Sequence, residues 1–236
     1  MSENKRRLLG QHFLTSNSVA KSIVNLAAIK RDDIVLEVGT GKGILIPYLC
    51  RKAKRVISVE KDSGLYKDAK AKFSATSNLS LEHGDAFEMD DLDFTVFVSN
   101  LPYSESRNAI EWLVQRKFSH AVIMVQSEFA QKLLVGEGKN RRAVSVIARY
   151  CMEMKKIMDV KKTNFQPRPN VDSVVIYLKQ KQKISKEVIA ATNKLFSFKR
   201  KTIRTIARKF DLTVDSDKRL EDLSDGEIIE IAKKVI

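Results

Sequence analysis

The sequence contains few cysteines, and they form no pattern. Its 236 residues include only Cys50 and Cys151, which lie far apart and lack the spacing typical of metal ligands. An unpaired thiol of this kind packs like a small apolar side chain. We therefore predict two buried thiols and no metal site.

Long apolar runs are also missing. No stretch approaches the roughly 20 apolar residues that a membrane-spanning helix needs. The first residues, MSENKRRLLGQHF, lack the apolar core of a signal peptide. We therefore expect a cytoplasmic protein that does not bind a membrane. The sequence contains no internal repeat and no low-complexity tract.

Acidic residues are scarce relative to basic ones. The chain has 43 Lys and Arg against 29 Asp and Glu, a net charge of +14. Such an excess is typical either of a highly charged solubility surface or of a protein with a polyanionic partner, most often nucleic acid. Clustering favours the partner, because residues 199–209 (KRKTIRTIARK) hold six basic residues and no acid, with smaller clusters at 139–142 and 5–7. The residues predicted to contact nucleic acid are Lys199, Arg200, Lys201, Arg204, Arg208, Arg141 and Arg142.

Apolar residues make up 43% of the chain, which indicates a globular protein. Up to about residue 180, short apolar runs alternate with amphipathic segments, as is typical of a mostly parallel α/β sheet. The expected strands are 34–38, 55–60, 79–83, 95–99 and 121–126. Two further runs, 156–160 and 173–178, have no helix between them and are expected to close the sheet as an antiparallel pair.

Helices are expected at both ends of the chain. The first follows Ser16 and Asn17 as caps, with Val19, Ile23 and Leu26 at helical spacing. After about residue 184 the pattern is helical only. One basic helix is expected to place Phe196, Ile203, Ile206 and Phe210 opposite Lys201, Arg204 and Arg208. A last helix is expected at 225–235, with Ser224 and Glu227 as a capping box. We therefore predict an α/β domain at 1–184 and a small basic helical domain at 185–236.

A glycine-rich turn follows the first expected strand, in IVLEVGTGKGIL (34–45). Glycine there lets the backbone approach a ligand at the start of a helix. The P-loop pattern does not fit, and a dinucleotide fingerprint would need glycine at Ile44. The remaining pattern, E-x-G-x-G-x-G, has Glu37 on the strand and glycines at 39, 41 and 43. It resembles the S-adenosylmethionine loop of class I methyltransferases.

Two acids at the ends of the next two strands fit the same cofactor. Glu60 ends the second strand, where a carboxylate can accept both hydroxyls of a ribose. Asp85 follows the third strand, where it can accept a hydrogen bond from an adenine amine. Either acid alone is typical of a solvated strand end. Together, at the carboxyl ends of successive strands, they favour the cofactor.

The fourth strand ends in Asn100-Leu101-Pro102-Tyr103, which suits an ordinary turn or a pocket for a flat ring that carries an amine. The exocyclic amine of adenine is a poor nucleophile because its lone pair is delocalised into the ring. The Asn100 side-chain oxygen and the Leu101 carbonyl can accept its two hydrogens and localise that lone pair. Pro102 fixes the turn and Tyr103 can stack on the purine. Because an in-line methyl transfer to this nitrogen needs no strong base, positioning does most of the catalysis.

These motifs, with GQHFL at 10–14, FQPRPNVDS at 165–173, FSFKRKTIR at 196–204 and RLEDLS at 219–224, resemble the KsgA-type ribosomal RNA adenine dimethyltransferases. The resemblance runs from about residue 7 to the C-terminus. It implies a Rossmann-like class I methyltransferase sheet, mostly parallel with antiparallel closing strands, and a small C-terminal helical domain that binds RNA. It also implies a monomer that uses S-adenosylmethionine to dimethylate N6 of two adjacent adenines. These adenines lie near the 3′ end of 16S ribosomal RNA in the immature small subunit.

The resemblance also implies roles for individual residues. The cofactor-binding residues that it implies are His12, Leu14, Gly39, Gly41, Glu60, Asp85 and Asn100. The catalytic residues that it implies are Asn100, Leu101, Pro102, Tyr103 and Phe165. In this assignment Asn100 joins the cofactor to the target amine, while Tyr103 and Phe165 sandwich the target base.

The sequence departs from the family pattern at two places. His12 stands where the family usually has Asn in a QNFL motif, and 136–146 (GEGKNRRAVSV) lacks the family's tyrosine and has Arg141 and Arg142 in its place. The C-terminal part is shorter than in bacterial members, so the chain reads more like an archaeal one. Residues outside the motifs are predicted to have no functional role, Trp112 and Phe118 as core and His83 and His120 as strand-end residues.

Three other functions are alternatives. An erythromycin-resistance-type methyltransferase would modify one adenine of 23S RNA, although VSVIARY at 144–150 favours the small-subunit enzymes. A non-catalytic RNA-binding assembly factor predicts decay of the donor and target motifs, but Glu37, Glu60, Asp85 and NLPY are intact. A small-molecule or protein methyltransferase does not explain the basic residues at 199–209, which suit phosphates.

Overall fold

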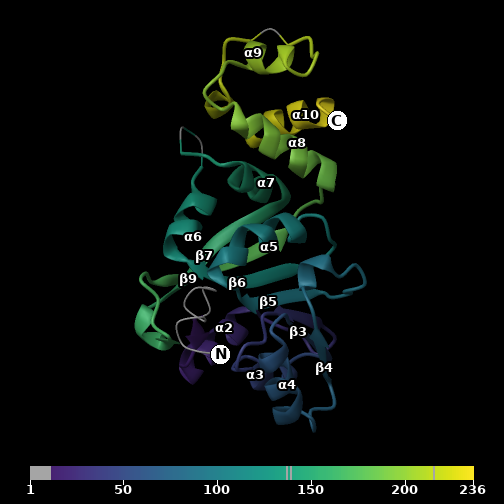
Figure 1. Ribbon diagram of the computed structural model, residues 1–236, viewed down its shortest axis with the longest axis vertical. Coiled ribbons are helices and arrows are strands. Elements are labelled where there is room, and N and C mark those ends of the chain that lie inside the picture. The colour runs from purple at the N-terminus through teal and green to yellow at the C-terminus, as the bar shows by residue number, and fades with distance from the viewer. Residues whose placement is uncertain (1–11, 137, 139, 215) are drawn as a thin grey trace. The chain divides into compact units, whose positions relative to one another are not determined.

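The computed structural model describes residues 12–136, 138, 140–214 and 216–236 (Figure 1). The basic cluster at 5–7, residues 10 and 11 of GQHFL, and Lys139 lie outside the described residues. Within them, no helix is both long enough and apolar enough to span a membrane.

The larger of the two sheets has seven strands (Figure 1). Its strands are β2 (Ile34–Val38), β3 (Arg55–Glu60), β4 (Leu79–His83), β5 (Val96–Asn100), β6 (His120–Gln126), β7 (Met152–Val160) and β9 (Ser173–Gln180). They lie in the order β4-β3-β2-β5-β6-β9-β7. The first five are parallel, and β9 runs antiparallel to β6. The predicted mostly parallel sheet with antiparallel closing strands is confirmed, and both closing strands are longer than predicted.

Short helices and one small second sheet complete the fold. The α-helices are α2 (Asn17–Leu26), α3 (Ile46–Cys50), α4 (Ser63–Lys72), α5 (Ser106–Leu113), α6 (Ser127–Leu134), α7 (Ala143–Cys151), α8 (Lys186–Ser197), α9 (Ile203–Arg208) and α10 (Asp225–Lys234). The second sheet pairs β1 (Phe13–Leu14) with β8 (Phe165–Gln166). Single 3-10 turns lie at η1 (Ala86–Glu88), η2 (Tyr103–Glu105), η3 (Lys162–Asn164) and η4 (Leu220–Asp222).

The chain packs as two compact units. Unit 1 comprises residues 1–108, 118–130 and 155–179, and unit 2 comprises 109–117, 131–154 and 180–236. The division near residue 180 lies close to the predicted 184/185 boundary, but unit 2 also takes in two earlier segments. The physical reason is apolar packing, because α7 and α8 both contact α10 and each other. Ile147, Leu195 and Ile228, one from each helix, are fully buried.

The core of unit 1 lies between one face of the sheet and helices α2 and α3. Side chains alternate along a strand, so Val35, Val56 and Val98 all point to this face and join one apolar cluster with Ile23 of α2 and Leu49 of α3. Glu37 has the same parity as Val35 on β2 and is therefore directed to the same side. The sheet thus holds a carboxyl group in an apolar layer.

The predicted first helix is confirmed, with a shifted apolar face. Ser16 caps it by accepting a hydrogen bond from the Val19 N–H at 3.3 Å. Ile23 is buried as predicted, together with Ala20 and Val24. Leu26 is 40% exposed, because the buried stripe runs through positions 20, 23, 24 and 27 and leaves position 26 outside it.

The single basic helix predicted at 196–210 is wrong. Helix α8 ends at Ser197, and α9 begins only at Ile203. Thr202 causes the second start, because its hydroxyl accepts a hydrogen bond from the Thr205 N–H at 3.3 Å and caps α9. Phe196 therefore belongs to α8. Ile203 and Ile206 belong to the separate helix α9, where both are buried. The capping box at the start of α10 is confirmed.

The remaining structural expectations are met in part. Trp112 and Phe118 are buried as predicted. Cys151 is buried, but Cys50 is only half-buried because it ends the short helix α3. Burial raises the pKa of Cys50 to about 11 and that of Cys151 to about 12, so both thiols stay protonated.

The two strand-end histidines differ from each other. His83 is exposed at the end of β4. His120 donates from Nε2 to the Ala27 carbonyl at 2.6 Å and stacks on Tyr177, so it has a structural role, and the absence of a functional role stays a prediction. Its role is to tie the C-terminal end of α2 to the sheet.

Candidate active site

Two motifs that lie far apart in the sequence meet in the small second sheet. β1 pairs antiparallel with β8, so that Leu14 lies opposite Phe165. The pairing continues past the strands, because the Thr15 N–H donates to the Asn164 carbonyl at 2.8 Å. The remaining part of GQHFL and the FQPRPNVDS segment therefore form one structural element.

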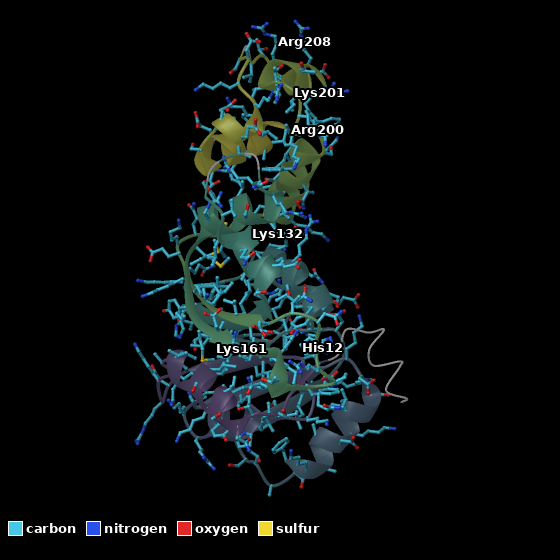
Figure 2. The ribbon with its side chains drawn as sticks, turned by 90° about the vertical axis from the view of Figure 1, so that its left-hand side faces the viewer. His12, Lys132, Lys161, Arg200, Lys201 and Arg208 are labelled. Carbon is cyan, nitrogen blue, oxygen red and sulfur yellow. The ribbon has the colours of Figure 1, made fainter. Side chains whose placement is uncertain are left out.

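The NLPY turn joins this element through Tyr103. Its hydroxyl and that of Ser173 are hydrogen-bonded at 2.8 Å, and its ring lies 5.3 Å from that of His12 at an interplanar angle of 36°. His12 in turn donates from Nδ1 to the Pro167 carbonyl at 2.8 Å. Because the carbonyl can only accept, Nδ1 carries the hydrogen. Three contacts thus hold Tyr103 and His12 together (Figure 2 labels His12).

The glycine-rich turn leads from β2 across the carboxyl edge of the sheet. Gly39 and Gly41 have φ values of +82° and +55°, a region that residues with a Cβ rarely adopt. A Cβ added at Gly41 would lie 3.3 Å from the Phe13 ring, so the turn also packs closely against β1. Gly39 and Gly41 therefore need to be glycine because of their left-handed backbone, and Gly41 also because of the Phe13 ring beside it.

Glu60 fixes this turn. Its two carboxylate oxygens accept hydrogen bonds from the N–H groups of Gly41 and Asp62, both at 2.8 Å. A carboxylate offers about four lone-pair directions, so each oxygen can accept one further hydrogen bond. The geometry therefore fits the predicted contact with two hydroxyl groups, and it also gives Glu60 a structural part that the sequence did not indicate.

Asp85 caps η1 after β4. Its carboxylate accepts hydrogen bonds from the Phe87 N–H at 3.0 Å and from the Lys61 ammonium at 2.7 Å. Burial raises the pKa of Asp85, but the hydrogen bonds from Lys61 and Phe87 outweigh this effect, so its pKa lies below the usual value. Asp85 is therefore ionised at neutral pH and is a hydrogen-bond acceptor only.

Glu37 lies behind the turn and is 2% exposed. The Ser58 hydroxyl donates to its carboxyl group at 2.5 Å and lies 2.6 Å from the Thr40 hydroxyl, which must then donate to Ser58. Burial raises the pKa of Glu37 to about 8, so that its neutral form predominates at pH 7. These three hydrogen-bonded side chains link the start of the turn to the second half of β3 without presenting a charge.

Two neighbouring hollows open at the carboxyl edge of the sheet in unit 1. The first is lined by the predicted residues His12, Leu14, Gly39, Gly41, Glu60, Asn100, Leu101, Pro102 and Tyr103. The second, of about 350 Å³, is lined by Asp85 and by Gly39, Glu60 and Pro102, which it shares with the first. The two hollows are therefore adjacent, and every residue predicted to bind the cofactor lines at least one of them.

Asn100 ends β5 and faces the first hollow. Within the part of the chain that the structure describes, its side-chain amide makes no hydrogen bond. The residue before it is fixed, since the Ser99 hydroxyl donates to the Val38 carbonyl at 2.5 Å. Pro102 sets the next turn with φ of −52°. A rigid backbone thus holds an unpartnered amide at the edge of the hollow.

Phe165 does not join this group. It is 3% exposed and packs in the apolar cluster of unit 1 with Leu14, its partner across β1 and β8. It lines neither hollow. The prediction that Phe165 stacks on the target base therefore does not fit its position, because strand pairing turns its ring into the core.

Arg141 also differs from its predicted role. It is 2% exposed, forms an ion pair with Asp225 and donates to the Leu223 carbonyl. Asp225 also receives Arg149, whose Nε lies 2.7 Å from its carboxylate. A side chain held in this way inside unit 2 does not contact RNA directly, so the prediction is wrong for Arg141. Its neighbour Arg142 is exposed.

The other predicted cations lie on the loop before α9 and on α9 itself. Lys199, Arg200, Lys201 and Arg208 are exposed (Figure 2 labels the last three). Arg204 is 41% exposed and pairs with the exposed Asp217 at 3.3 Å. An exposed ion pair of this kind contributes little to stability, so Arg204 can leave Asp217 for another anion at little cost.

Several residues of the site were not predicted individually from the sequence. Ser173 holds the Tyr103 hydroxyl, and its signal was available because it closes the FQPRPNVDS motif. Lys61 directly follows Glu60, but nothing in the sequence indicated that it pairs with Asp85. Thr40 and Ser58 carry no motif beyond the glycine turn. No group of three or more His, Cys, Asp or Glu residues that could hold a metal occurs in the described ranges.

The fold and the site together define a class of protein. A mostly parallel sheet, a glycine turn after β2 and acids after β3 and β4 are the features of a class I S-adenosylmethionine-dependent methyltransferase. The model of the family described as ribosomal RNA adenine dimethylase matches residues 2–236. The chain therefore belongs to the ribosomal RNA adenine dimethylase family.

Individual proteins give the same answer. The chain is 35% identical over 233 residues to the ribosomal RNA small subunit methyltransferase A of Thermotoga neapolitana, covering 96% of this chain and 90% of that protein. It is 39% identical over 169 residues to the probable ribosomal RNA small subunit methyltransferase A of Methanosarcina mazei, covering 71% and 62%. These relatives include a bacterial and an archaeal protein.

Solved structures agree with the sequence relatives. The crystal structure of a dimethyladenosine transferase from Plasmodium falciparum superposes with a TM-score of 0.81 at 27% identity, covering 95% of this chain and 99% of that one. The 23S rRNA methyltransferase ErmE superposes with a TM-score of 0.68 at 21% identity over 94% and 99%, and shares the fold.

The family implies S-adenosylmethionine as the methyl donor, and the residues present fit it. Gly39 and Gly41 line the first hollow with backbone alone, and Glu60 and the ionised Asp85 offer acceptors for hydroxyl and amine groups. Two adjoining hollows suit a ligand with a ring at one end and a flexible chain at the other. When bound, this donor supplies an electrophilic methyl group on a sulfonium.

Proposed function

We propose that the protein transfers methyl groups to N6 of two adjacent adenines near the 3′ end of small-subunit ribosomal RNA during ribosome assembly. One observation carries the proposal: the Asn100 amide at the edge of the first hollow has no hydrogen-bond partner among the described residues. An amide oxygen fixed in that position can accept a hydrogen bond from a ligand, and the exocyclic amine of adenine can donate one.

The proposed chemistry rests on positioning. Asn100 Oδ1 and the Leu101 carbonyl accept the two amine hydrogens, so the nitrogen lone pair turns out of the ring plane towards the donor's methyl group. After attack the nitrogen is cationic and acidic, so a proton leaves without a strong base. Because these hydrogen bonds strengthen as the nitrogen becomes cationic, they stabilise the transition state more than the bound substrate.

Tyr103 is the proposed stacking surface for the flipped-out base. Ser173 holds its hydroxyl and His12 lies beside its ring, which fixes the orientation that stacking needs. Burial raises the pKa of Tyr103, so the ring stays neutral. Since Phe165 is buried, we leave it out of the stacking pair and assign it to the wall that supports β1.

The cofactor assignments follow the lining of the two hollows. We propose that Glu60 binds the ribose, Asp85 the adenine amine, and Gly39 and Gly41 the backbone of the donor. His12 and Leu14 then flank its methionine end. Lys61 keeps Asp85 ionised and in place.

RNA affinity is proposed to come from the small helical domain at 185–236. Its exposed residues Lys199, Arg200, Lys201 and Arg208, with Arg204, would neutralise phosphates without reading sequence. The exposed Arg142, which precedes this domain in the chain, would add to them. We further propose that the protein acts as a monomer in the cytoplasm on the immature small subunit. Light scattering of the purified protein tests the monomer.

The deciding experiment is methyl transfer to isolated ribosomal subunits. Immature small subunits and large subunits are each incubated with the protein and labelled donor, and primer extension then maps any block near the 3′ end of the small-subunit RNA. We expect label and two adjacent blocks in small-subunit RNA only. Label in large-subunit RNA alone would support the erythromycin-resistance-type function, and tight subunit binding without label would support a non-catalytic assembly factor.

A further inference from the structure

A third hollow, of about 340 Å³, lies beside the first hollow in unit 1 and shares Leu14, Lys42 and Ile44 with it. Its charged lining residues are Lys42, Arg51 and Lys72, and no acidic residue lines it. Thr15 and Asn17 add polar side chains. We call it the basic hollow.

The three cations of the basic hollow are held by aromatic rings. The distances from cation to ring centroid are 5.2 Å for Lys42 over Phe13, 5.8 Å for Arg51 over Tyr48 and 5.0 Å for Lys72 over Phe73. Lys72 also donates to the Lys42 carbonyl at 3.1 Å. None of the three forms an ion pair with another described residue. No carboxylate of the described residues therefore offsets their charge, and the contacts with the rings partly order their side chains before any ligand arrives.

This charge is local and not a general property of unit 1. A hollow at the opposite edge of the sheet includes Ile34 and Arg55, the first residues of β2 and β3, and is lined by Glu82, Asp90, Asp91 and Asp93. The first and second hollows at the carboxyl edge also include acidic lining residues, such as Glu60 and Asp85, whereas the basic hollow beside them includes none. Its positive charge is therefore confined to one part of that edge.

We infer that the basic hollow binds backbone phosphates of the RNA strand next to the target adenine. The inference rests on the proposed function, because the strand that delivers a base to the first hollow must continue across its rim. Lysine and arginine side chains suit phosphate oxygens, and the Asn17 side-chain amide can donate to the same oxygens. The basic hollow thus gives unit 1 an RNA-binding site in addition to the cations on and before α9.

The test uses two triple variants of the full-length protein with identical changes in charge. The first is Lys42→Gln, Arg51→Gln and Lys72→Gln, in the basic hollow. The control is Lys30→Gln, Arg31→Gln and Lys54→Gln, three exposed residues just before β2 and β3, at the other edge of the sheet. For each we measure KM and kcat on immature small subunits, the salt dependence of RNA binding, and donor affinity by calorimetry.

We expect the basic-hollow variant to raise KM for subunits about tenfold, with donor affinity changed less than twofold. Since each phosphate contact on single-stranded RNA contributes about 0.7 to the slope of log K against log salt, three lost contacts should flatten that slope by about two. The control variant should change KM less than twofold. The unchanged donor affinity also shows that the variant is folded.

Three outcomes would overturn the inference while the wild-type protein methylates small-subunit RNA normally. Both triples could weaken RNA binding equally, which would make net charge the cause. The second such outcome is that neither triple variant changes KM for subunits. The basic-hollow variant could lose donor affinity but keep its RNA affinity, which would assign Lys42 to the donor's carboxylate. If instead the wild-type protein transfers no methyl group to either subunit, the proposed function fails, and that result is distinct from all three.

Discussion

The carboxyl edge of the sheet in unit 1 and the helical unit 2 hold their charged groups in opposite ways. In unit 1, Glu60 and Asp85 are fixed by backbone N–H groups and Lys61, and point to hollows shaped by glycine turns. In unit 2 most cations of the loop before α9 are exposed, while Arg141 is held inside. The first arrangement suits recognition of one small molecule in a defined pose. The second suits a long polyanion, which needs charge density more than geometry.

Arg141 differs from the exposed cations of unit 2 because it is buried and forms an ion pair with Asp225. Asp225→Asn removes the carboxylate shared by Arg141 and Arg149 and leaves a buried guanidinium without its counter-charge. We expect a loss of about 3–5 kcal/mol in the free energy of unfolding, measured in urea. The control Asp217→Asn breaks the exposed pair with Arg204 and should cost less than about 1 kcal/mol. Equal losses in the two variants would contradict this distinction.

Asn100→Ala tests the fixed geometry of unit 1. Because the proposed hydrogen bond strengthens only as the amine reacts, we expect turnover to fall about 100-fold or more, as for other single groups that stabilise a transition state. Donor affinity should change little. Single-turnover methyl transfer and calorimetry measure the two effects, with Asn25→Ala on the exposed part of α2 as control. Near-normal turnover would remove Asn100 from the proposed catalytic residues.

Glu37 makes the stability of unit 1 depend on pH. Its pKa is about 8 in the folded protein against 4.5 without burial, so the folded state retains a proton that the unfolded state loses. This contribution to stability is complete below pH 4.5 and is lost as the pH rises towards 8. We expect Glu37→Gln to remove up to about 1.4 kcal/mol per pH unit of that slope. Urea unfolding between pH 5 and 8 is the measurement, with the exposed Glu82→Gln as control; identical slopes in all three proteins would be the contrary result.

The smallest effect is expected from the exposed cations before α9. Lys199→Gln with Lys201→Gln should weaken RNA binding a few-fold and flatten the salt slope by about one, because two phosphate contacts are lost. Lys183→Gln with Lys234→Gln removes the same charge from other exposed positions of unit 2 and should leave the slope nearly unchanged. A titration of RNA binding over a salt series compares them, and matching slopes would mean that position within unit 2 is irrelevant.

The comparison also explains which predictions succeeded. The parallel strands were found to within one or two residues at most ends, because a buried strand needs a short apolar run that is visible in the sequence. The residues predicted to bind the cofactor belong to turns, glycines and strand ends, which are local features of the sequence. They line the two hollows because the carboxyl ends of parallel strands meet at one edge, and their contact with the cofactor stays a prediction.

The failures share a different cause. Lys199 and Arg141 are both basic residues in basic clusters, yet one is exposed and the other is 2% exposed against Asp225. Phe165 sits in a functional motif but turns into the core through its pairing with β1. Charge and aromatic character are visible in the sequence, whereas burial depends on partners that lie far away along the chain.

The sequence by itself therefore determined the succession of strands along the chain, the glycine-rich turn, the strand-end acids and the excess of positive charge. These depend on side-chain periodicity and on backbone preferences that act over a few residues. Only the tertiary structure decided that Ser173 holds Tyr103, that Arg141 is internal and that Lys42, Arg51 and Lys72 gather around one hollow. Each of these is a contact between distant segments, and its energy depends on which surfaces the folded chain brings together.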